Sequence, residues 1–244
     1  MTEPNKLVLW DIDLTLIRAG TAGRELYAAA FRRLTGRPLI HMVDAAGRMD
    51  PDIWNETLET NHLTPSSYSF SAFAASLAET YESGSDLLRK HGEVLPGATE
   101  ALRALRASGR TVQTILTGNI APVARVKLAT FGLDGLVDLE IGTFGTDGST
   151  RAALVRVARQ RAFTKHRVPF DGPDTVVIGD SHHDVVAGHE AGARVIAVAS
   201  GRTPFADLER LEPQHLLRDL KDTTAILHAV LDGKSRVIEE ELGH

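Results

Sequence analysis

The sequence of 244 residues has no cysteine, few aromatic residues and no long hydrophobic run. Without cysteine the chain can form no disulfide, no thiolate metal site and no cysteine nucleophile. No apolar stretch approaches the roughly 20 residues that a membrane-spanning helix requires. Hydrophobic residues nevertheless make up 43% of the chain, which excludes disorder for most of it. These features predict a soluble, cytoplasmic protein with a sizeable core.

Basic residues are too few and too scattered to suggest a nucleic-acid surface. The 27 Lys and Arg residues are outnumbered by 32 Asp and Glu residues, which gives a formal net charge of −5. Proteins that bind nucleic acid concentrate basic side chains in a patch or a run, and no such run is present. The acidic excess also opposes an anionic substrate, unless the field around the binding site is reversed locally.

Short apolar runs recur along the chain and are separated by helical patterns. Near-continuous apolar runs of a few residues are typical of strands that are buried on both faces of a parallel sheet. From residue 112 onward the order strand–helix–strand repeats, which predicts a doubly wound α/β fold. We predict strands over 7–10, 112–116, 136–141, 175–178, 195–198 and, more weakly, 216–217, with helices over 98–107 and 121–131.

About a hundred residues after the first apolar run contain no convincing strand. Helical periodicity covers 22–34, a helix is expected to begin at Asp50 as its N-cap, and a third helical stretch covers about 70–90 with a break at Gly84. A block of helices inserted after the first strand predicts a helical cap. We therefore expect an α/β core formed by 1–16 and 92–244, and an inserted cap domain formed by 17–91.

Two carboxylates follow the first predicted strand, at Asp11 and Asp13. The carboxyl ends of strands are where ligands bind in open α/β sheets. With a period of two, both side chains would point to one face, and two like charges at that distance need a cation or a shared proton. Magnesium, which takes carboxylate and phosphate oxygens, fits this requirement. A solvated, Asp-rich turn is the alternative.

A hydroxyl, a glycine and an amide end the second strand, at Thr117, Gly118 and Asn119. A phosphate could accept hydrogen bonds from the Thr117 side chain and from the following backbone amides at a helix N-terminus. The alternative is an ordinary N-cap with a permissive turn.

A third strand end carries Asp180 and Asp184, four residues apart across a turn into a helix. These residues can supply a metal ligand and a carboxylate behind it. The adjacent His182 and His183 lack a third ligand at a suitable spacing, so we interpret them as surface or helix-start residues rather than as a zinc site.

Together, these three strand ends resemble the haloacid dehalogenase superfamily, and specifically its phosphatase branch with a helical cap, including the phosphoglycolate phosphatases. The resemblance rests on the DxDxT motif at 11–15, the Thr117 motif, the GDxxxD-type motif at 179–184 and the helical block between about 17 and 91. Each motif is weak alone, whereas all of them in this order, each at a strand end, are specific.

The resemblance implies a two-step phosphoryl transfer. Asp11 would be the nucleophile that forms an aspartyl-phosphate, and Asp13 would protonate the leaving oxygen and then activate water. Thr117, with the amides of Gly118 and Asn119, would hold the transferring phosphoryl group.

The resemblance also implies a magnesium cofactor and a small-molecule phosphate ester as the partner. Charge and hydropathy predict no nucleic-acid and no membrane partner, and we expect a monomer or homodimer. Mg²⁺ would be bound by Asp11, by Asp13 through its backbone carbonyl, and by Asp180 with Asp184. Thr15 is expected to belong to the substrate-binding set.

The sequence departs from the family pattern in the position of its phosphate-stabilising cation. Family members often carry a Lys after the third strand, where residues 142–147 have none. Lys127 lies on the helix after Asn119, and helical side chains lean toward the N-terminus, so we assign this role to Lys127. Arg151 is the alternative cation, and Lys127 on a solvated surface is the third possibility. Lys165 is expected on a loop far from the strand tips.

A second departure is Leu14, which stands where the family usually has glycine. A leucine there predicts a backbone conformation that L-residues adopt readily.

Substrate choice is expected to come from the cap, since the core recognises only the phosphoryl group and the metal. The segment 47–51 is the candidate cap loop, in which Arg48 could pair with a second anionic group of the substrate. A solvated Arg48 beside a helix start is the alternative.

Three other functions remain open at this stage. A sugar phosphomutase of the same branch would use the same Asp pair and return the phosphoryl group. A DxD glycosyltransferase would use Mn²⁺ and a nucleotide sugar, but the Thr117 and Asp180 motifs oppose it. A catalytically degenerate α/β binding protein is the non-enzymatic alternative. Dehalogenase activity is not expected, because the members that displace halide lack an acid/base Asp at position 13.

Overall fold

The structure, a computed structural model, describes residues 4–232 of the chain. Its centre is a parallel sheet of five strands, which confirms the doubly wound α/β prediction. The sheet order is β4 (Thr111–Ile115), β1 (Lys6–Trp10), β5 (Thr175–Gly179), β6 (Arg194–Val198) and β7 (His215–Leu217). Five of the six predicted strands are therefore present.

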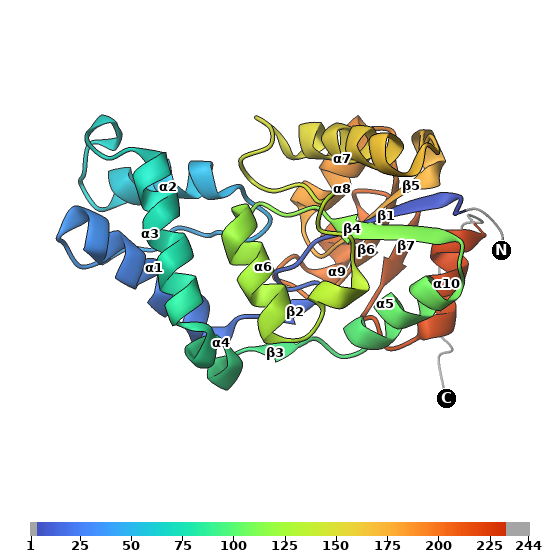
Figure 1. Ribbon diagram of the computed structural model, residues 1–244, viewed down its shortest axis with the longest axis horizontal. Helices are drawn as coiled ribbons and strands as arrows, with labels where there is room; N and C mark the ends of the chain where they lie inside the picture. Colours follow the sequence, from blue (N-terminus) through green and yellow to red (C-terminus); the bar gives the residue numbers. More distant parts are fainter. Residues whose placement is uncertain (1–3, 233–244) are drawn as a thin grey trace.

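Alternation along β1 explains why its sequence is apolar throughout. Val8 and Trp10 pack into one hydrophobic cluster with helices of one face, whereas Leu7 and Leu9 pack into another on the opposite face. Figure 1 shows α7 and α8 on one side of the sheet and α5 and α10 on the other. The helices of the core are α5 (Ala98–Ala107), α6 (Ala121–Thr130), α7 (Arg151–His166), α8 (His182–Glu190), α9 (Phe205–Glu209) and α10 (Thr223–Leu231), with single 3-10 turns at Asp134–Leu136 and Gly172–Asp174.

The helices that follow β1 form a block whose hydrophobic cluster also includes Ile120 and Val123 at the start of α6. They are α1 (Gly20–Thr35), α2 (Asp50–Thr60), α3 (Phe70–Ser83) and α4 (Ser85–His91), with a 3-10 turn at Pro65–Ser67. Trp54 stacks on Phe73 with ring centroids 4.0 Å apart at its centre. The chain leaves and re-enters the core through a short antiparallel pair, β2 (Ile17–Arg18) and β3 (Glu93–Val94). In Figure 1 this block lies to one side of the sheet, beyond α6.

Helix boundaries follow local signals closely. The break predicted at Gly84 separates α3 from α4, and α2 begins at Asp50, although Met49 rather than Asp50 is its N-cap. Within residues 4–232, no helix has the length and apolar character needed to cross a membrane.

The strand predicted over 136–141 is wrong. This segment runs beside β4 but makes only isolated backbone contacts with it, including the hydrogen bond from the Asp138 amide to the Gln113 carbonyl (2.8 Å). The Asp138 carboxylate accepts from the Glu140 amide (3.1 Å) and forms a local turn instead of a ladder. Only a single bridge, between Leu116 and Thr143, follows.

The position of Lys165 also differs from the prediction. It lies in the last turn of α7 rather than on a loop, and its ammonium group pairs with Glu140 (2.6 Å).

Leu14 has φ +65°, in the left-handed region, which contradicts the expectation of an ordinary L-residue backbone. The tight turn after β1 requires this conformation, because the Leu14 amide donates to the Ile17 carbonyl (2.8 Å) while the amides of Leu16 and Ile17 donate to Ile12 (2.9 and 3.0 Å). A left-handed conformation costs a residue with a Cβ atom about 1 kcal/mol relative to glycine.

We therefore expect Leu14→Gly to be more stable than Leu14→Ala by about 1 kcal/mol in urea unfolding, the reverse of the usual order of these residues. Both variants lose the isopropyl group of leucine and differ from each other by one methyl group, so their difference mainly reports the backbone conformation. Equal stability, or a more stable alanine variant, would contradict a strained turn at this position.

Candidate active site

Strand register brings the three predicted motifs to one edge of the sheet. Trp10, the last residue of β1, lies opposite Ile115 in β4 and Ile178 in β5. The residues that follow each strand, Asp11 and Thr117 among them, therefore meet above the same edge. Sequence positions more than a hundred residues apart become neighbours through parallel pairing alone.

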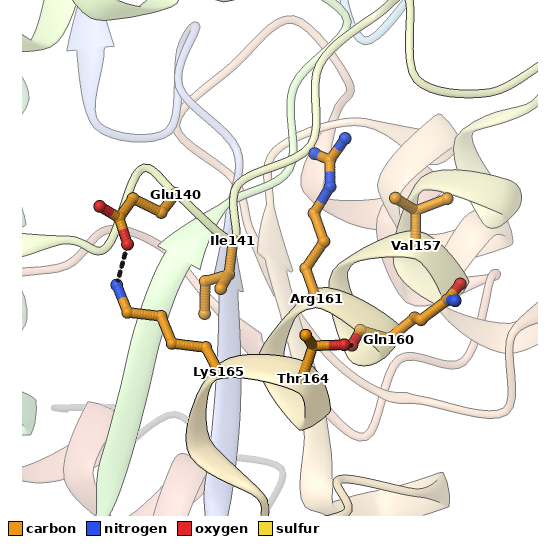
Figure 2. A pocket seen from close by; sticks show the side chains of 7 residues that line it. All are labelled: Glu140, Ile141, Val157, Gln160, Arg161, Thr164 and Lys165. Atoms are coloured by element: carbon orange, nitrogen blue, oxygen red, sulfur yellow. Dashed lines mark hydrogen bonds and ion pairs between the residues drawn. The ribbon is translucent and has the colours of Figure 1, made fainter.

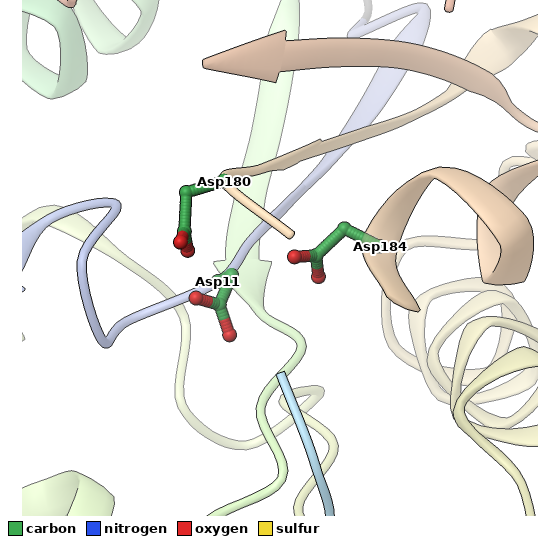
Figure 3. A group of neighbouring side chains, drawn as sticks. All are labelled: Asp11, Asp180 and Asp184. Atoms are coloured by element: carbon green, nitrogen blue, oxygen red, sulfur yellow. The ribbon is translucent and has the colours of Figure 1, made fainter. Parts of the chain in front are cut away.

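Asp11, Asp180 and Asp184 form a buried cluster of carboxylates, shown in Figure 3. One oxygen from each lies within 4.8 Å of the others. Burial, with the charge of Asp184, raises the pKa of Asp11 to about 7. Burial, with the charge of Asp11, raises the pKa of Asp180 to about 8. Burial and mutual repulsion therefore both favour the protonated forms of these two carboxyl groups.

Arg151, in the first turn of α7, is the cation that reaches this cluster. Its Nη2 lies 2.5 Å from Asp11 Oδ1 and 2.6 Å from Asp184 Oδ1. Burial lowers the pKa of Arg151, but Asp184 and Asp11 outweigh this effect and raise it overall. One guanidinium thus serves two of the three carboxylates.

The cluster suits a divalent cation such as Mg²⁺. The donors are all oxygen atoms, which is the chemistry that Mg²⁺ prefers. The Thr15 hydroxyl donates to Asp180 Oδ1 (3.1 Å) and to Asp11 Oδ2 (3.3 Å), so it orients two members of the set.

Asp184 differs from the other two carboxylates because both its oxygens are engaged. Oδ1 accepts from Arg151, and Oδ2 accepts from the Ser181 hydroxyl (2.6 Å) and the Ser181 amide (3.1 Å) in a capping box at the start of α8. His182 and His183 occupy the first turn of α8, as predicted.

Asp13 turns away from the cluster and is about one-third exposed. Lys127 Nζ lies 2.7 Å from Asp13 Oδ1 and 2.6 Å from Oδ2, and the Asn119 side-chain amide donates to Oδ2 (2.7 Å). Burial lowers the pKa of Lys127, but the Asp13 carboxylate outweighs this and raises it overall. Both cations that the sequence offered therefore contact a carboxylate of the loop after β1. Arg151 contacts Asp11, and Lys127 contacts Asp13.

Thr117 and Gly118 follow β4, and Gly118 lies against the segment that connects α1 to α2. The Thr117 hydroxyl accepts from the Asn119 amide (3.2 Å) and side chain (3.0 Å). A Cβ atom at Gly118 would lie 1.9 Å from the Arg48 carbonyl oxygen, so only glycine allows this approach. The Asp50 amide in turn donates to the Gly118 carbonyl (2.8 Å).

Asp50 ties α2 to the start of α6. Its carboxylate is buried and accepts from the Ile120 amide (2.7 Å). Burial raises the pKa of Asp50 to about 6, although the Ile120 amide and Lys127 act in the opposite direction.

Arg48 lies near the site but is held by other groups. Its guanidinium donates to the Asp44 carbonyl (3.1 Å) and to Glu56 Oε2 (2.5 Å). Its backbone, rather than its side chain, contacts Gly118.

A cavity of about 790 Å³ lies between the helical block and the core, and Asp13, Asn119 and Lys127 are on its wall. A second hollow, shown in Figure 2, lies on the core beside α7. Its charged groups are paired with neighbours, Lys165 with Glu140 and Arg161 with Asp147 (2.9 Å). The cavity at Asp13 thus adjoins the loop that follows β1 and the start of α6.

Arg151, which the sequence offered as the alternative cation, contacts Asp11 and Asp184 from helix α7, which was not predicted. A signal for it exists in the sequence. Thr150 is an N-cap whose hydroxyl accepts from the Ala153 amide (3.1 Å), and an alanine- and arginine-rich run follows. This pattern predicts Arg151 in the first turn of a helix. The structure then places that turn near the strand ends.

We expect Arg151→Met to be far more destabilising than Lys127→Met. Loss of Arg151 leaves Asp11 and Asp184 buried and unpaired, which costs about 3–5 kcal/mol. Loss of Lys127 leaves Asp13 without its cation, but water still reaches this carboxylate, so the loss costs about 1 kcal/mol. Urea unfolding without metal at pH 7.5 measures both, and equal losses would contradict the distribution of charge described here.

The raised pKa values of Asp11 and Asp180 also predict how Mg²⁺ and pH act together. Because folding raises these values above the ordinary 3.8, the folded state loses stability as the pH rises from about 4 to about 8. A divalent cation competes with these protons, so Mg²⁺ should raise the Tm more at pH 8 than at pH 5. At a hundred times its Kd, Mg²⁺ would add about 2.7 kcal/mol.

Thermal unfolding with and without Mg²⁺ at both pH values tests this coupling. Asp180→Asn should lose most of the Mg²⁺ effect. A Tm shift that is the same at both pH values, or larger at pH 5, would show that Mg²⁺ does not bind these carboxylates.

Comparisons with known proteins bear on the family and the fold of the chain. Over 144 residues the chain is 26% identical to "Probable phosphatase IndB" from Dickeya dadantii, covering 57% of this chain and 58% of that protein. It is 24% identical over 135 residues to phosphoglycolate phosphatase from Haemophilus influenzae, covering 54% and 56%. The matched stretches thus span little more than half of these relatives.

The structure is similar to that of a candidate beta-phosphoglucomutase from Bacteroides vulgatus, with a TM-score of 0.64 and 18% identity, covering 96% of this chain and 92% of the other. At this identity the similarity concerns the fold. The model of the haloacid dehalogenase-like hydrolase family matches residues 8–189, about three quarters of the chain. The chain therefore belongs to the haloacid dehalogenase-like hydrolases.

Proposed function

We propose that the protein is a Mg²⁺-dependent phosphatase that hydrolyses a small phosphorylated metabolite through an aspartyl-phosphate. The observation that carries this proposal is the contrast between two carboxylates of one loop. Asp11 is buried in the acidic cluster, whereas Asp13 lies on the cavity wall between Lys127 and Asn119. Family membership and relatives named as phosphatases support the same reaction.

Asp11 is the proposed nucleophile. Its Oδ1 is oriented by Arg151 and its Oδ2 by the Thr15 hydroxyl, so the carboxylate has one defined position. In the first step a carboxylate oxygen of Asp11 attacks phosphorus, and the bond from phosphorus to the ester oxygen breaks. Arg151 would also stabilise charge on the transferring group from its place against Asp11.

Asp13 is the proposed acid and base. Its position on the cavity wall allows it to give a proton to the leaving ester oxygen and to take one from the water that hydrolyses the aspartyl-phosphate. Lys127 and Asn119 fix the orientation of this carboxylate. In this arrangement Lys127 acts on Asp13, and Arg151 is the cation beside the nucleophile.

Thr117 and the Gly118 backbone would bind the transferring phosphoryl group at the end of β4. Asp11, Asp180 and the Asp13 backbone carbonyl would hold Mg²⁺, with Asp184 behind them. When bound, the ion neutralises charge on the carboxylates and the phosphoryl oxygens.

We further propose that residues 17–91 act as the cap over this site and that residues 1–16 and 92–244 form the core, of which 1–3 and 233–244 lie outside the described residues. A cytoplasmic location and a monomeric or homodimeric state stay predictions.

Hydrolysis of p-nitrophenyl phosphate in the presence of Mg²⁺ tests the proposal. Wild type should turn over, Asp11→Asn should lose turnover, and Asp13→Asn should lose about 10²–10⁴-fold in kcat. Asp86→Asn, which removes an exposed carboxylate of α4, serves as the matched control and should be unaffected. Lys127→Ala should lose most of its kcat while remaining folded.

No wild-type turnover, or full turnover by Asp11→Asn, would overturn the proposal. An active Lys127→Ala variant would instead assign electrostatic stabilisation to Arg151 alone. A sugar phosphomutase would convert a sugar phosphate into its isomer rather than release inorganic phosphate, so measuring both products separates these reactions.

A further inference from the structure

The cavity at Asp13 is walled by both parts of the molecule. Helices α1, α2 and α3 contribute Tyr27, Ile53 and Leu77, and the core contributes Val123 from α6. At about 790 Å³ the cavity is larger than a phosphoryl group alone requires. Asp11 and Thr117, which we assign to the transferring phosphoryl group, are absent from its lining. The cavity therefore surrounds the remainder of the substrate.

The lining carries five cationic and three acidic side chains, in a chain whose net charge is −5. Two further acids, Glu56 and Glu93, lie outside the lining and pair with two of the five cations. The cationic residues are Arg18, Arg24, Arg48, Lys127 and Arg202, and the acidic ones are Asp13, Asp44 and Asp50.

Four of the five cations already have ion-pair partners. The pairs are Lys127 with Asp13, Arg48 with Glu56, Arg202 with Asp44, and Arg18 with Glu93. Arg48, which the sequence offered as a contact for a second anionic group, is therefore engaged by Glu56 and by the Asp44 carbonyl.

Arg24 is the remaining cation of the cavity. Within residues 4–232, its guanidinium has neither a hydrogen-bond nor an ion-pair partner. It lies on the face of α1 that lines the cavity, together with Gly20, Gly23 and Tyr27 at helical spacing.

We propose that Arg24 binds a second anionic group of the substrate, so that the substrate is a phosphate ester that also carries a carboxylate or a second phosphate. This inference rests on the proposed phosphatase function. An arginine without an internal partner can form a bidentate, charge-assisted pair with either anion. Arg202, whose pair with Asp44 is exposed and therefore weak, provides a second positive charge in the same lining.

The test compares matched substrates under identical Mg²⁺ and pH conditions. Alkyl phosphates of two to six carbons are set against ω-carboxyalkyl phosphates and α,ω-alkane bisphosphates of the same lengths. In at least one anionic series, wild type should show a kcat/KM about tenfold or more above that of the alkyl phosphate of equal length. The better series identifies the second anion as a carboxylate or a phosphate.

Arg24→Gln should lose most of this preference, mainly through a higher KM for the anionic ester, since Arg24 binds a group remote from the reacting atoms. Arg24→Lys should retain part of it. Arg32→Gln is the matched control, because Arg32 is an exposed arginine of the same helix that does not line the cavity, and it should keep the preference. Higher ionic strength should weaken the preference.

Two results would overturn the inference: no preference for either anionic series at any length, or a preference that survives in Arg24→Gln. Both leave alkyl phosphate hydrolysis in place and so leave the proposed phosphatase function standing. Failure of wild type to hydrolyse every ester would instead overturn the phosphatase function, and with it the inference that depends on it.

Discussion

Three buried carboxylates, two of which share one guanidinium, are the constraint on which the rest of this structure depends. Asp11, Asp180 and Asp184 are brought together by the parallel register of β1 and β5, and burial makes their negative charge costly. Arg151 offsets part of that cost from the first turn of α7. The all-oxygen donor set is the basis on which we propose a divalent cation at this site.

The loop after β1 gives its two aspartates opposite surroundings. Asp11 is enclosed in the acidic cluster, while Asp13 reaches the cavity and is held by Lys127 and Asn119. The left-handed conformation of Leu14 belongs to the tight turn that follows. Two carboxylates of the same type can thus be assigned different chemistry, because the backbone directs one inward and the other outward.

The helical block contributes to the site through backbone contact and through charge. Its segment at Arg48 lies directly on Gly118, which tolerates this approach only because it has no side chain. The same block supplies Arg24 and Tyr27 to the cavity wall. The net charge of −5 is therefore a poor guide to substrate, since acidic groups concentrate at the sheet edge while the cavity lining is cationic.

By itself, the sequence determined the parallel α/β class and five of the six strands that were predicted, because apolar periodicity is a local property. It also determined most helix boundaries, because Gly84 and the prolines at helix starts act locally. It also predicted that Asp11 and Asp180 follow strand ends and share one edge. The prediction of a strand over 136–141 was wrong, because the Asp138 side chain forms a turn there. That error arose because apolar content alone does not reveal side-chain competition for backbone amides.

Only the tertiary structure decided which cation meets which carboxylate. Lys127 and Arg151 both stood at acceptable sequence distances, but the packing of α7 against the sheet places Arg151 on Asp11, and α6 directs Lys127 to Asp13. Likewise, the pairing of Arg48 with Glu56 leaves Arg24 as the cavity cation without a partner among residues 4–232. Charge pairing depends on distances between elements far apart in the chain, which no local pattern encodes.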